Sequence, residues 1–210
     1  MELIAGVSGK MDVVFAVDSS RRVDPEMFNK MKELVKASLA SYNISESEAR
    51  IGLVGFGDKA EISKKPADGA SGSELEQSVI ELKRIGGARR MNKAMRKMQA
   101  EIFNDAMNSK RKAKQVLVLF TTGKNSGDGS GSLPSTARSL RQQGVDIIVV
   151  SIGKEKDLNE LQAIAGKLKN VIDIPSFEML PNAIGVLEGK VQETTGDSFF
   201  AILICFYASI

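Results

Sequence analysis

Short apolar runs that alternate with amphipathic helical segments constrain the fold of this 210-residue chain more than any other feature. Residues 11–17 are apolar apart from one aspartate, and residues 116–120 and 145–152 are apolar at most positions. Runs of this length that are rich in valine and isoleucine are typical of strands buried on both faces. Strands of this kind, separated by helices, form a parallel sheet that is covered on both sides. The sequence therefore predicts an α/β, doubly wound, mostly parallel sheet with helices on both faces.

The rest of the chain continues this alternation. Asp24, which is followed by a proline, predicts the start of a helix whose apolar residues recur at three- and four-residue spacing until Tyr42. Ser73 and Glu76 have the spacing of a capping box and predict the start of a second helix. Further strands are predicted over residues 50–56, 60–63 and 171–174, and helices over residues 73–82, 90–106, 134–143, 158–168 and 177–192.

The length and the hydrophobic content of the chain predict a single domain. With 42% hydrophobic residues, the chain buries one sizeable core but is too short for two ordinary domains without a visible linker. We expect this domain over residues 11–196, after a lead-in over residues 1–10 that lacks the features of a signal peptide. Residues 197–210 form a mostly apolar tail that is much shorter than the ~20 residues of a membrane helix. We interpret this tail as a truncated anchor or an artefact.

The absence of histidine limits the chemistry that the chain can perform. It excludes histidine-based zinc sites, histidine acid–base catalysis and nucleophiles activated by histidine, so we expect no enzyme. The single cysteine, Cys205, cannot form an internal disulfide and does not indicate a compartment. The net charge is only +3, because 29 basic residues are nearly matched by 26 acidic ones, so nucleic acid is not an expected partner.

Small polar residues and glycines follow the predicted strands or precede a helix. Asp18-Ser19-Ser20 closes the first strand, Thr122-Gly123 follows the strand over residues 116–120, and Gly86-Gly87 precedes a helix. Parallel sheets of this kind bind ligands in the crevice at the carboxyl ends of the strands, where the strand order reverses. We therefore expect these three loops to converge on one site. Residues 123–126 lack the glycine spacing of a phosphate-binding loop, so a nucleotide is not expected there.

Four stretches of the chain resemble the von Willebrand factor type A domain, which is found in integrins, matrilins and collagen VI. They match its first strand with the start of an Asp-x-Ser-x-Ser motif, its second strand, its Gly-Gly-x-Thr loop with the following helix, and its fourth and fifth strands. The stretches are residues 12–20, 49–58, 86–95, and 116–123 with 137–153. The resemblance implies a Rossmann-like, six-stranded sheet with one antiparallel edge strand, and a ligand bound at the top face. Many members hold a magnesium ion there, and an acidic residue of the partner completes its shell.

Three of the five metal-ligand positions that the resemblance implies have changed in this chain. Asp18 and Ser20 match the first two positions, but Arg22 stands at the second serine, Arg89 at the threonine and Thr122 at the aspartate. Magnesium requires oxygen ligands, and an arginine has no lone pair to offer. A guanidinium ~5 Å from a divalent ion costs about 6–7 kcal/mol at an effective dielectric constant of ~20. We therefore expect no functional metal site and no cofactor, with Arg22 or Arg89 neutralising Asp18 instead.

Two surfaces are candidates for binding. The predicted ligand-binding top face consists of Asp18, Ser19, Ser20, Arg22, Arg89, Thr122 and Lys124. The predicted basic patch consists of Arg84, Arg90, Lys93, Arg96 and Lys97, with a further basic run over residues 110–114. A charge run of this kind is either a solvated surface or a surface for sulfated glycans or acidic proteins, whose affinity falls with salt.

These features predict a non-catalytic, protein-binding adhesion module of an extracellular-matrix or cell-surface protein that binds without a metal ion. The expected location is extracellular, as part of a longer chain, and a glycosylation sequon at Asn43 favours secretion. Membrane anchoring through residues 197–210 is the alternative location. Two other functions stay open, which are a basic surface for sulfated glycans and a structural spacer in a multi-domain matrix protein.

Overall fold

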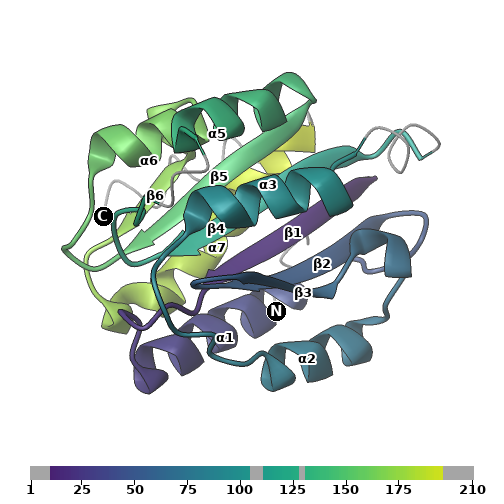
Figure 1. Ribbon diagram of the computed structural model, residues 1–210. Helices are drawn as coiled ribbons and strands as arrows, with labels where there is room; N and C mark the ends of the chain where they lie inside the picture. The colour runs from purple at the N-terminus through teal and green to yellow at the C-terminus, as the bar shows by residue number, and fades with distance from the viewer. Residues whose placement is uncertain (1–9, 105–110, 128–130, 196–210) are drawn as a thin grey trace, which may run out of the picture.

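The structure of the chain, a computed structural model, describes residues 10–104, 111–127 and 131–195. Six strands form one sheet in the order β3-β2-β1-β4-β5-β6 (Figure 1). Neighbouring strands are parallel except β2 and β3, which are antiparallel. The strands are β1 (Met11–Asp18), β2 (Ala49–Phe56), β3 (Ala60–Lys64), β4 (Lys114–Thr121), β5 (Val145–Ile152) and β6 (Val171–Ile174). This architecture confirms the predicted fold class, including the antiparallel edge strand.

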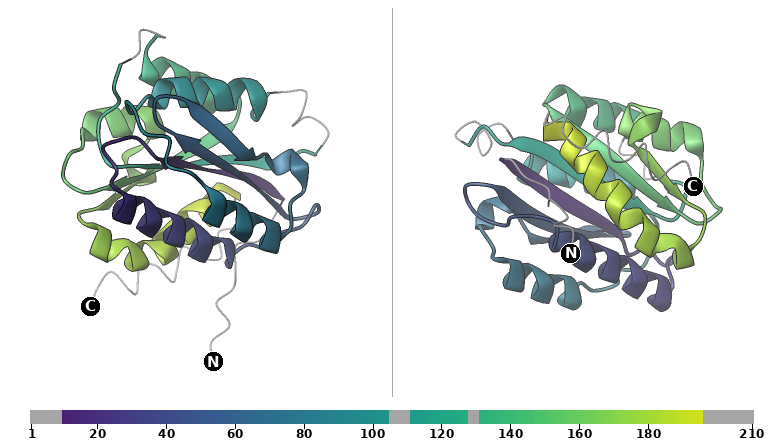
Figure 2. Two further views of the ribbon diagram at one scale, coloured as in Figure 1. Left: turned by 60° about the horizontal axis from the view of Figure 1, so that its bottom comes forward. Right: turned by 180° about the vertical axis from the view of Figure 1, so that it is seen from behind.

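Helices cover both faces of the sheet (Figures 1 and 2). One face carries α1 (Pro25–Leu39), α2 (Gly72–Glu81) and α7 (Leu180–Thr195), and the other carries α3 (Met91–Glu101), α5 (Leu133–Gln142) and α6 (Leu158–Ala165). Three short 3-10 helices lie in the connections, namely η1 (Pro66–Asp68), η2 (Leu168–Asn170) and η3 (Phe177–Met179). No helix in the described part of the chain is both long and apolar enough to cross a bilayer.

The central strand β1 is buried at every position. Successive side chains of a strand point to opposite faces of the sheet. Phe15 accordingly belongs to the apolar core beneath α1, α2 and α7, whereas Val14 belongs to the core beneath α3, α5 and α6. Because both faces of the strand are covered, its sequence is continuously apolar rather than alternating. The prediction of a strand buried on both faces is confirmed.

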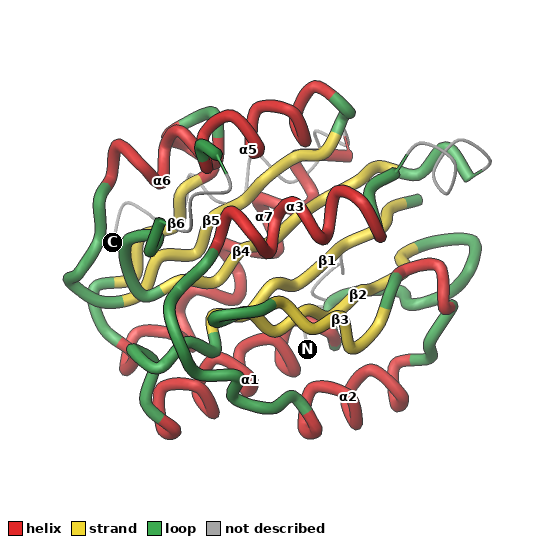
Figure 3. The backbone as a smooth tube through the Cα atoms, in the orientation of Figure 1, coloured by secondary structure: helices red, strands yellow, loops and turns green. Residues whose placement is uncertain are grey.

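The chain leaves β1 and β4 toward opposite edges of the sheet (Figure 3). These two strands are neighbours, but β1 is followed by β2 on one side and β4 is followed by β5 on the other. The loops that follow them therefore diverge and leave a crevice at the carboxyl ends of the strands. Asp18 ends β1 and Thr121 ends β4, so both residues lie at this crevice.

The capping box predicted for α2 was wrong by two residues. Ser71 is the N-cap, because its backbone is extended and its side chain accepts a hydrogen bond from the Glu74 N–H. The Glu74 carboxylate in turn accepts from the Ser71 N–H at 2.8 Å. Ser73, which the prediction used as the cap, already lies in the first turn of the helix. Both serine–glutamate pairs have the right spacing, and only the backbone conformation distinguishes them.

The helices α1, α3 and α6 end earlier than predicted, α1 at Leu39. α3 ends at Glu101, because the N–H groups of both Ile102 and Phe103 bond to the Met98 carbonyl and the regular helical ladder stops there. Both apolar residues are still buried, which is why the helical spacing seemed to continue. α6 ends at Ala165, because Gly166 adopts a left-handed conformation with φ of +79° that closes the helix. The predicted lead-in and tail fall, apart from the boundary residue Lys10, on residues 1–9 and 196–210, outside the described residues.

A buried carboxylate joins three strands at the amino ends of the sheet. Asp12 is 1% exposed and accepts two hydrogen bonds of 2.9 Å from Arg50 and one of 3.0 Å from Gln115. Arg111 also donates to Asp12 and, in addition, to the carbonyl of Glu46 at 2.9 Å. Asp12, Arg50 and Gln115 come from β1, β2 and β4 respectively. The basic run over residues 110–114 is thus not purely a surface, because Arg111 is largely buried and structural.

We expect Asp12→Ala to lower the free energy of unfolding by about 3–5 kcal/mol, because it leaves Arg50 and Arg111 buried beside each other without a carboxylate. Asp146→Ala is the matched control, since Asp146 forms a half-exposed pair with Lys114 at 2.7 Å at the start of neighbouring strands. Its loss should stay within about 1 kcal/mol. Chemical denaturation followed by circular dichroism measures both values, and equal losses would contradict the structural role of Asp12.

Candidate functional site

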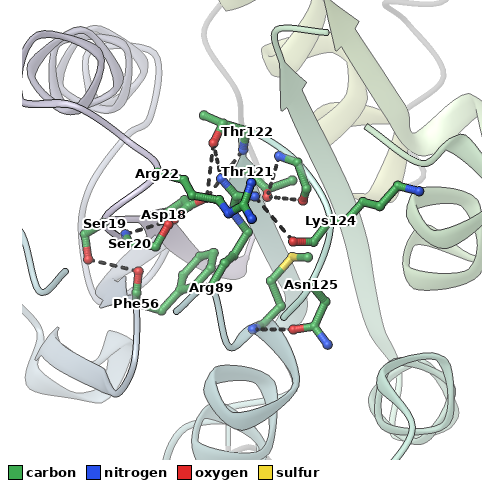
Figure 4. A network of polar contacts seen from close by, with 12 residues as sticks. Asp18, Ser19, Ser20, Arg22, Phe56, Arg89, Thr121, Thr122, Lys124 and Asn125 are labelled. Atoms are coloured by element: carbon green, nitrogen blue, oxygen red, sulfur yellow. Dashed lines mark hydrogen bonds and ion pairs between the residues drawn. The ribbon is translucent and has the colours of Figure 1, made fainter. Parts of the chain in front are cut away.

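Three loops at the crevice bring Asp18, Arg89 and Thr122 together (Figure 4). Asp18 comes from the end of β1, Arg89 precedes α3, and Thr122 directly follows β4. The Asp18 side chain is fully buried and that of Arg89 is 2% exposed. An ion pair this deep is strongly destabilised when either partner is removed, because the other charge then lacks compensation.

The Arg89 guanidinium links the segments around the crevice through three hydrogen-bond donors. Its Nε donates to Oδ2 of Asp18, its Nη2 donates to Oγ1 of Thr122, and its Nη1 donates to the Lys124 carbonyl at 3.3 Å. The other oxygen of Asp18, Oδ1, accepts from the Ser20 N–H at 3.0 Å. Both oxygens of the carboxylate are therefore occupied by donors of the chain itself.

Arg89 and not Arg22 neutralises Asp18. The sequence left these two arginines as alternatives, and the structure separates them by burial. Arg22 has a side chain that is 61% exposed and forms an ion pair with Glu155 at 3.5 Å. Arg89 can reach Asp18 because it follows the Gly86-Gly87 turn, which is hydrogen-bonded to the loop after β1.

Glycines allow the loops to approach each other this closely. Gly86 and Gly87 adopt φ angles of +75° and +68°, which favour glycine. A Cβ atom at Gly87 would also lie 2.4 Å from the Cβ of Asp58. At Gly123, a Cβ atom would lie 2.8 Å from the Nη1 of Arg89 and 2.3 Å from the carbonyl oxygen of Glu155. Gly123, which lies in the loop after β4, thus leaves the space that the Arg89 guanidinium needs.

The residues present do not fit the magnesium ion that the fold implies. The Oδ2 atom of Asp18 already accepts a hydrogen bond from Arg89, whose positive charge lies beside the carboxylate. Ser20 keeps its position and its buried Oγ has no hydrogen-bond partner within the described residues, but one serine and one carboxylate fall short of an octahedral shell. The described part of the chain also holds no group of three or more carboxylate, cysteine or histidine side chains arranged for a metal.

The other predicted top-face residues lie around this pair. Ser19 is buried, and its hydroxyl donates to the Phe56 carbonyl of β2 at 2.9 Å. The Lys124 side chain points away from Asp18 into solvent (Figure 4) and pairs with Asp157 at 3.3 Å. The Glu160 N–H and the Lys124 ammonium both hydrogen-bond to Asp157 and lower the pKa of its carboxyl. The seven predicted residues thus share one region, but their side chains do not all face one point.

The loop after β5 joins this region and was missed by the sequence-based prediction. Lys154, Glu155 and Lys156 line a pocket of about 380 Å³ together with Arg22 and residues of the loop after β4. We call it the top pocket, lined by Arg22, Arg89, Lys124, Asn125, Ser126, Lys154, Glu155 and Lys156. The sequence could have indicated this loop, because it follows the carboxyl end of a predicted strand, as the loops after β1 and β4 do.

Two of the five residues of the predicted basic patch have acidic neighbours. Arg90 pairs with Asp58 at 2.6 Å and lowers the pKa of that carboxyl, and Lys97 lies 3.8 Å from Glu101. Its other three members, Arg84, Lys93 and Arg96, are exposed. The sequon residue Asn43 is likewise exposed, in the loop between α1 and β2.

Comparisons with known proteins agree on one family. The family model of the von Willebrand factor type A domain matches residues 12–185. The chain is 29% identical to von Willebrand factor A domain-containing protein 2 of Xenopus laevis, over 93% of this chain and 24% of that protein. It is 26% identical to the human collagen alpha-6(VI) chain, over 95% of this chain and 9% of that protein. Human matrilin-4 is 24% identical, over 90% of this chain and 30% of that protein. The chain thus spans less than a third of each relative.

A solved structure shows the same fold. Proximal thread matrix protein 1 from the mussel byssus superposes with a TM-score of 0.79 at 21% identity, over 90% of this chain and 47% of that chain. One structure of that protein is described as having a zinc-occupied MIDAS motif.

We expect Arg89→Met to lower the free energy of unfolding by about 3–5 kcal/mol, because it leaves the Asp18 carboxylate buried and uncompensated. Arg22→Met should leave the unfolding free energy unchanged, since that guanidinium is exposed. The double change Asp18→Asn with Arg89→Met should recover part of the loss, because it removes the unpaired charge. Urea denaturation measures all three, and an Arg22→Met loss as large as that of Arg89→Met would contradict the assignment.

Proposed function

Because the chain belongs to the von Willebrand factor type A domain family, we propose that it is a non-catalytic, protein-binding adhesion module that acts without a metal ion. The buried Asp18–Arg89 pair is the observation that supports binding without a metal ion. It provides the positive charge that a divalent ion would otherwise bring to this carboxylate. The top face therefore has a fixed internal cation in place of an exchangeable one.

The proposed partner is an extracellular-matrix or cell-surface protein. The relatives include matrilin-4 and collagen VI chains, and the structural neighbour is a thread matrix protein. We propose an extracellular location for the same reason, with the chain acting as one part of a longer protein. The exposed sequon at Asn43 supports this location, because an acceptor asparagine must be accessible. Anchoring through residues 197–210 stays the alternative location.

The described residues form no catalytic constellation at the top face, which supports a binding role. The sequence contains no histidine to serve as a general base. The serines of the site are buried. The Ser19 hydroxyl donates to the Phe56 carbonyl, and the Ser20 hydroxyl has no hydrogen-bond partner among the described residues. Neither serine contacts a group that could activate it as a nucleophile.

Binding of sulfated glycans is the second candidate, and the exposure of Arg84, Lys93 and Arg96 favours it. These three cations lie in the loop before α3 and on the first half of that helix. We rank this function below protein binding, because the other two members of the patch have acidic neighbours. No specific contact favours a purely structural spacer over either function.

We expect excess EDTA and excess magnesium chloride to leave the melting temperature unchanged, because Asp18 is already paired with Arg89. Binding to immobilised matrix proteins, measured by surface plasmon resonance, should likewise survive EDTA. The positive control is the triple variant Arg22→Ser, Arg89→Thr and Thr122→Asp, which restores the ligand types of the family. Its melting temperature should rise with magnesium and fall with EDTA. A clear drop for the unchanged chain on chelation would contradict metal-independent binding.

A heparin column tests the glycan alternative. If protein binding is the function, the chain should elute at or below physiological salt, because the patch has few unpaired cations and exposed charges are screened. Retention to higher salt would favour the glycan function, provided that it falls in the variant Arg84→Gln, Lys93→Gln and Arg96→Gln. Asn29→Gln, on the opposite face of the sheet, is the neutral control.

A further inference from the structure

The top pocket is a concave, cation-rich surface that lies beside the Asp18–Arg89 pair and not on it. Its volume is about 380 Å³, and it opens between the loops after β1, β4 and β5. Arg89 contributes to its floor but is nearly inaccessible and already satisfies Asp18. A ligand would therefore meet the cations of the rim, which are the exposed Arg22, Lys124 and Lys154 and the largely buried Lys156.

Two cations of the rim, Arg22 and Lys124, are held by weak, exposed ion pairs. Arg22 lies 3.5 Å from Glu155, and the side chains of these residues are 61% and 78% exposed. Lys124 pairs with Asp157, whereas the third pair, Lys156 with Asp173, is largely shielded because the Lys156 side chain is only 18% exposed. Within the described residues, the ammonium of Lys154 has no ion pair. Exposed pairs of this kind contribute little to stability, so a carboxylate from outside can replace an internal one at small cost.

Glu155 stands where an external acid would bind. It is the one acidic residue among those that line the top pocket, and its carboxylate reaches Arg22 from the loop after β5. No hydrogen bond and no second ion pair of the described residues fixes that carboxylate. Glu155 thus occupies Arg22 in the free protein without being locked in place.

We propose that the top pocket accepts an acidic side chain of a protein partner, that Arg22 and Lys154 bind its carboxylate, and that Glu155 competes with it. The proposal rests on the proposed protein-binding function and names the chemistry that the partner must offer. Arg22 suits this task, because a guanidinium can bind a carboxylate through two parallel hydrogen bonds. The partner's acid then bonds to cations of the protein, whereas in metal-dependent relatives it completes the shell of an ion.

The charge balance favours an acidic peptide over a sulfated glycan. The four cations of the rim face the three carboxylates of Glu155, Asp157 and Asp173, so the local net charge is only +1. A polyanion binds most strongly to an extended surface of one sign. A single carboxylate requires only one exchange, in which it takes the place of Glu155 at Arg22.

An NMR titration with a short peptide tests this assignment. The probe is the blocked peptide acetyl-Gly-Ser-Glu-Ser-Gly-amide, and the same peptide with glutamine is the matched control. We expect the glutamate peptide to shift the Arg22 side-chain resonance and the amides of residues 154–156, and the glutamine peptide to shift neither. Arg22→Gln and Lys154→Gln should each weaken binding by roughly two- to fivefold, the range of one exposed ion pair.

Glu155→Gln should change the affinity in the opposite direction and tighten binding by roughly two- to fivefold, because it removes the competitor. Glu76→Gln is its control, since Glu76 also forms an exposed pair, with Lys36 at 3.2 Å, but on the helices α1 and α2 beneath the sheet. It changes the net charge equally and should leave the affinity unchanged. An unchanged or weaker affinity of Glu155→Gln would overturn the proposal.

Two further results would also overturn it. One is a sulfated heparin disaccharide that shifts the same resonances when the glutamate peptide does not, which would assign the pocket to glycans. The other is matrix-protein binding that persists unchanged in Arg22→Gln and Lys154→Gln, which would place the partner elsewhere while leaving the proposed adhesion function intact. Melting temperatures check that these exposed substitutions leave the fold unaltered.

Discussion

The pairing of a fully buried carboxylate with a nearly buried guanidinium determines how the upper half of this domain is assembled. Asp18 ends the central strand at the point where the strand order reverses, a place where an uncompensated charge would be very costly. Arg89 compensates it from a loop 71 residues further along the chain. The same guanidinium reaches Thr122 and the Lys124 carbonyl, so the loops after β1 and β4 and the loop before α3 are fixed by a single side chain.

The amino end of β1 also carries a buried carboxylate that arginines compensate. Asp12 is the second residue of the strand and Asp18 is its last, and both are almost completely buried. Asp12 receives arginines from β2 and from the segment before β4, which join the three central strands at their amino ends. The continuously apolar strand between the two carboxylates contributes burial but little specificity of register. The two ion-pair clusters supply that specificity, because each links chain segments that are distant in sequence.

The sequence predicted the sheet well because its signals are local. The bounds of β5 and β6 agree with the prediction, because each strand is a mostly apolar run whose end can be recognised in the sequence. The site was predicted less completely. Whether Arg22 or Arg89 meets Asp18 depends on the path of the Gly86-Gly87 turn, which no periodicity encodes. The contribution of Glu155 was missed for the same reason, because only the folded chain brings the loop after β5 to Arg22.

Under the proposed binding without an ion, Arg89 also changes what kind of binding the top face performs. A divalent ion keeps an open coordination position that an incoming carboxylate fills directly, whereas the guanidinium of Arg89 is almost fully enclosed and uses three of its donors internally. In the proposed binding mode, recognition of an acid therefore moves outward to exposed cations, where water and salt screen the attraction. Contacts of this kind are individually weak and readily exchanged. A domain built this way gains specificity from how the rim places its cations around the pocket, and not from the strength of any single bond.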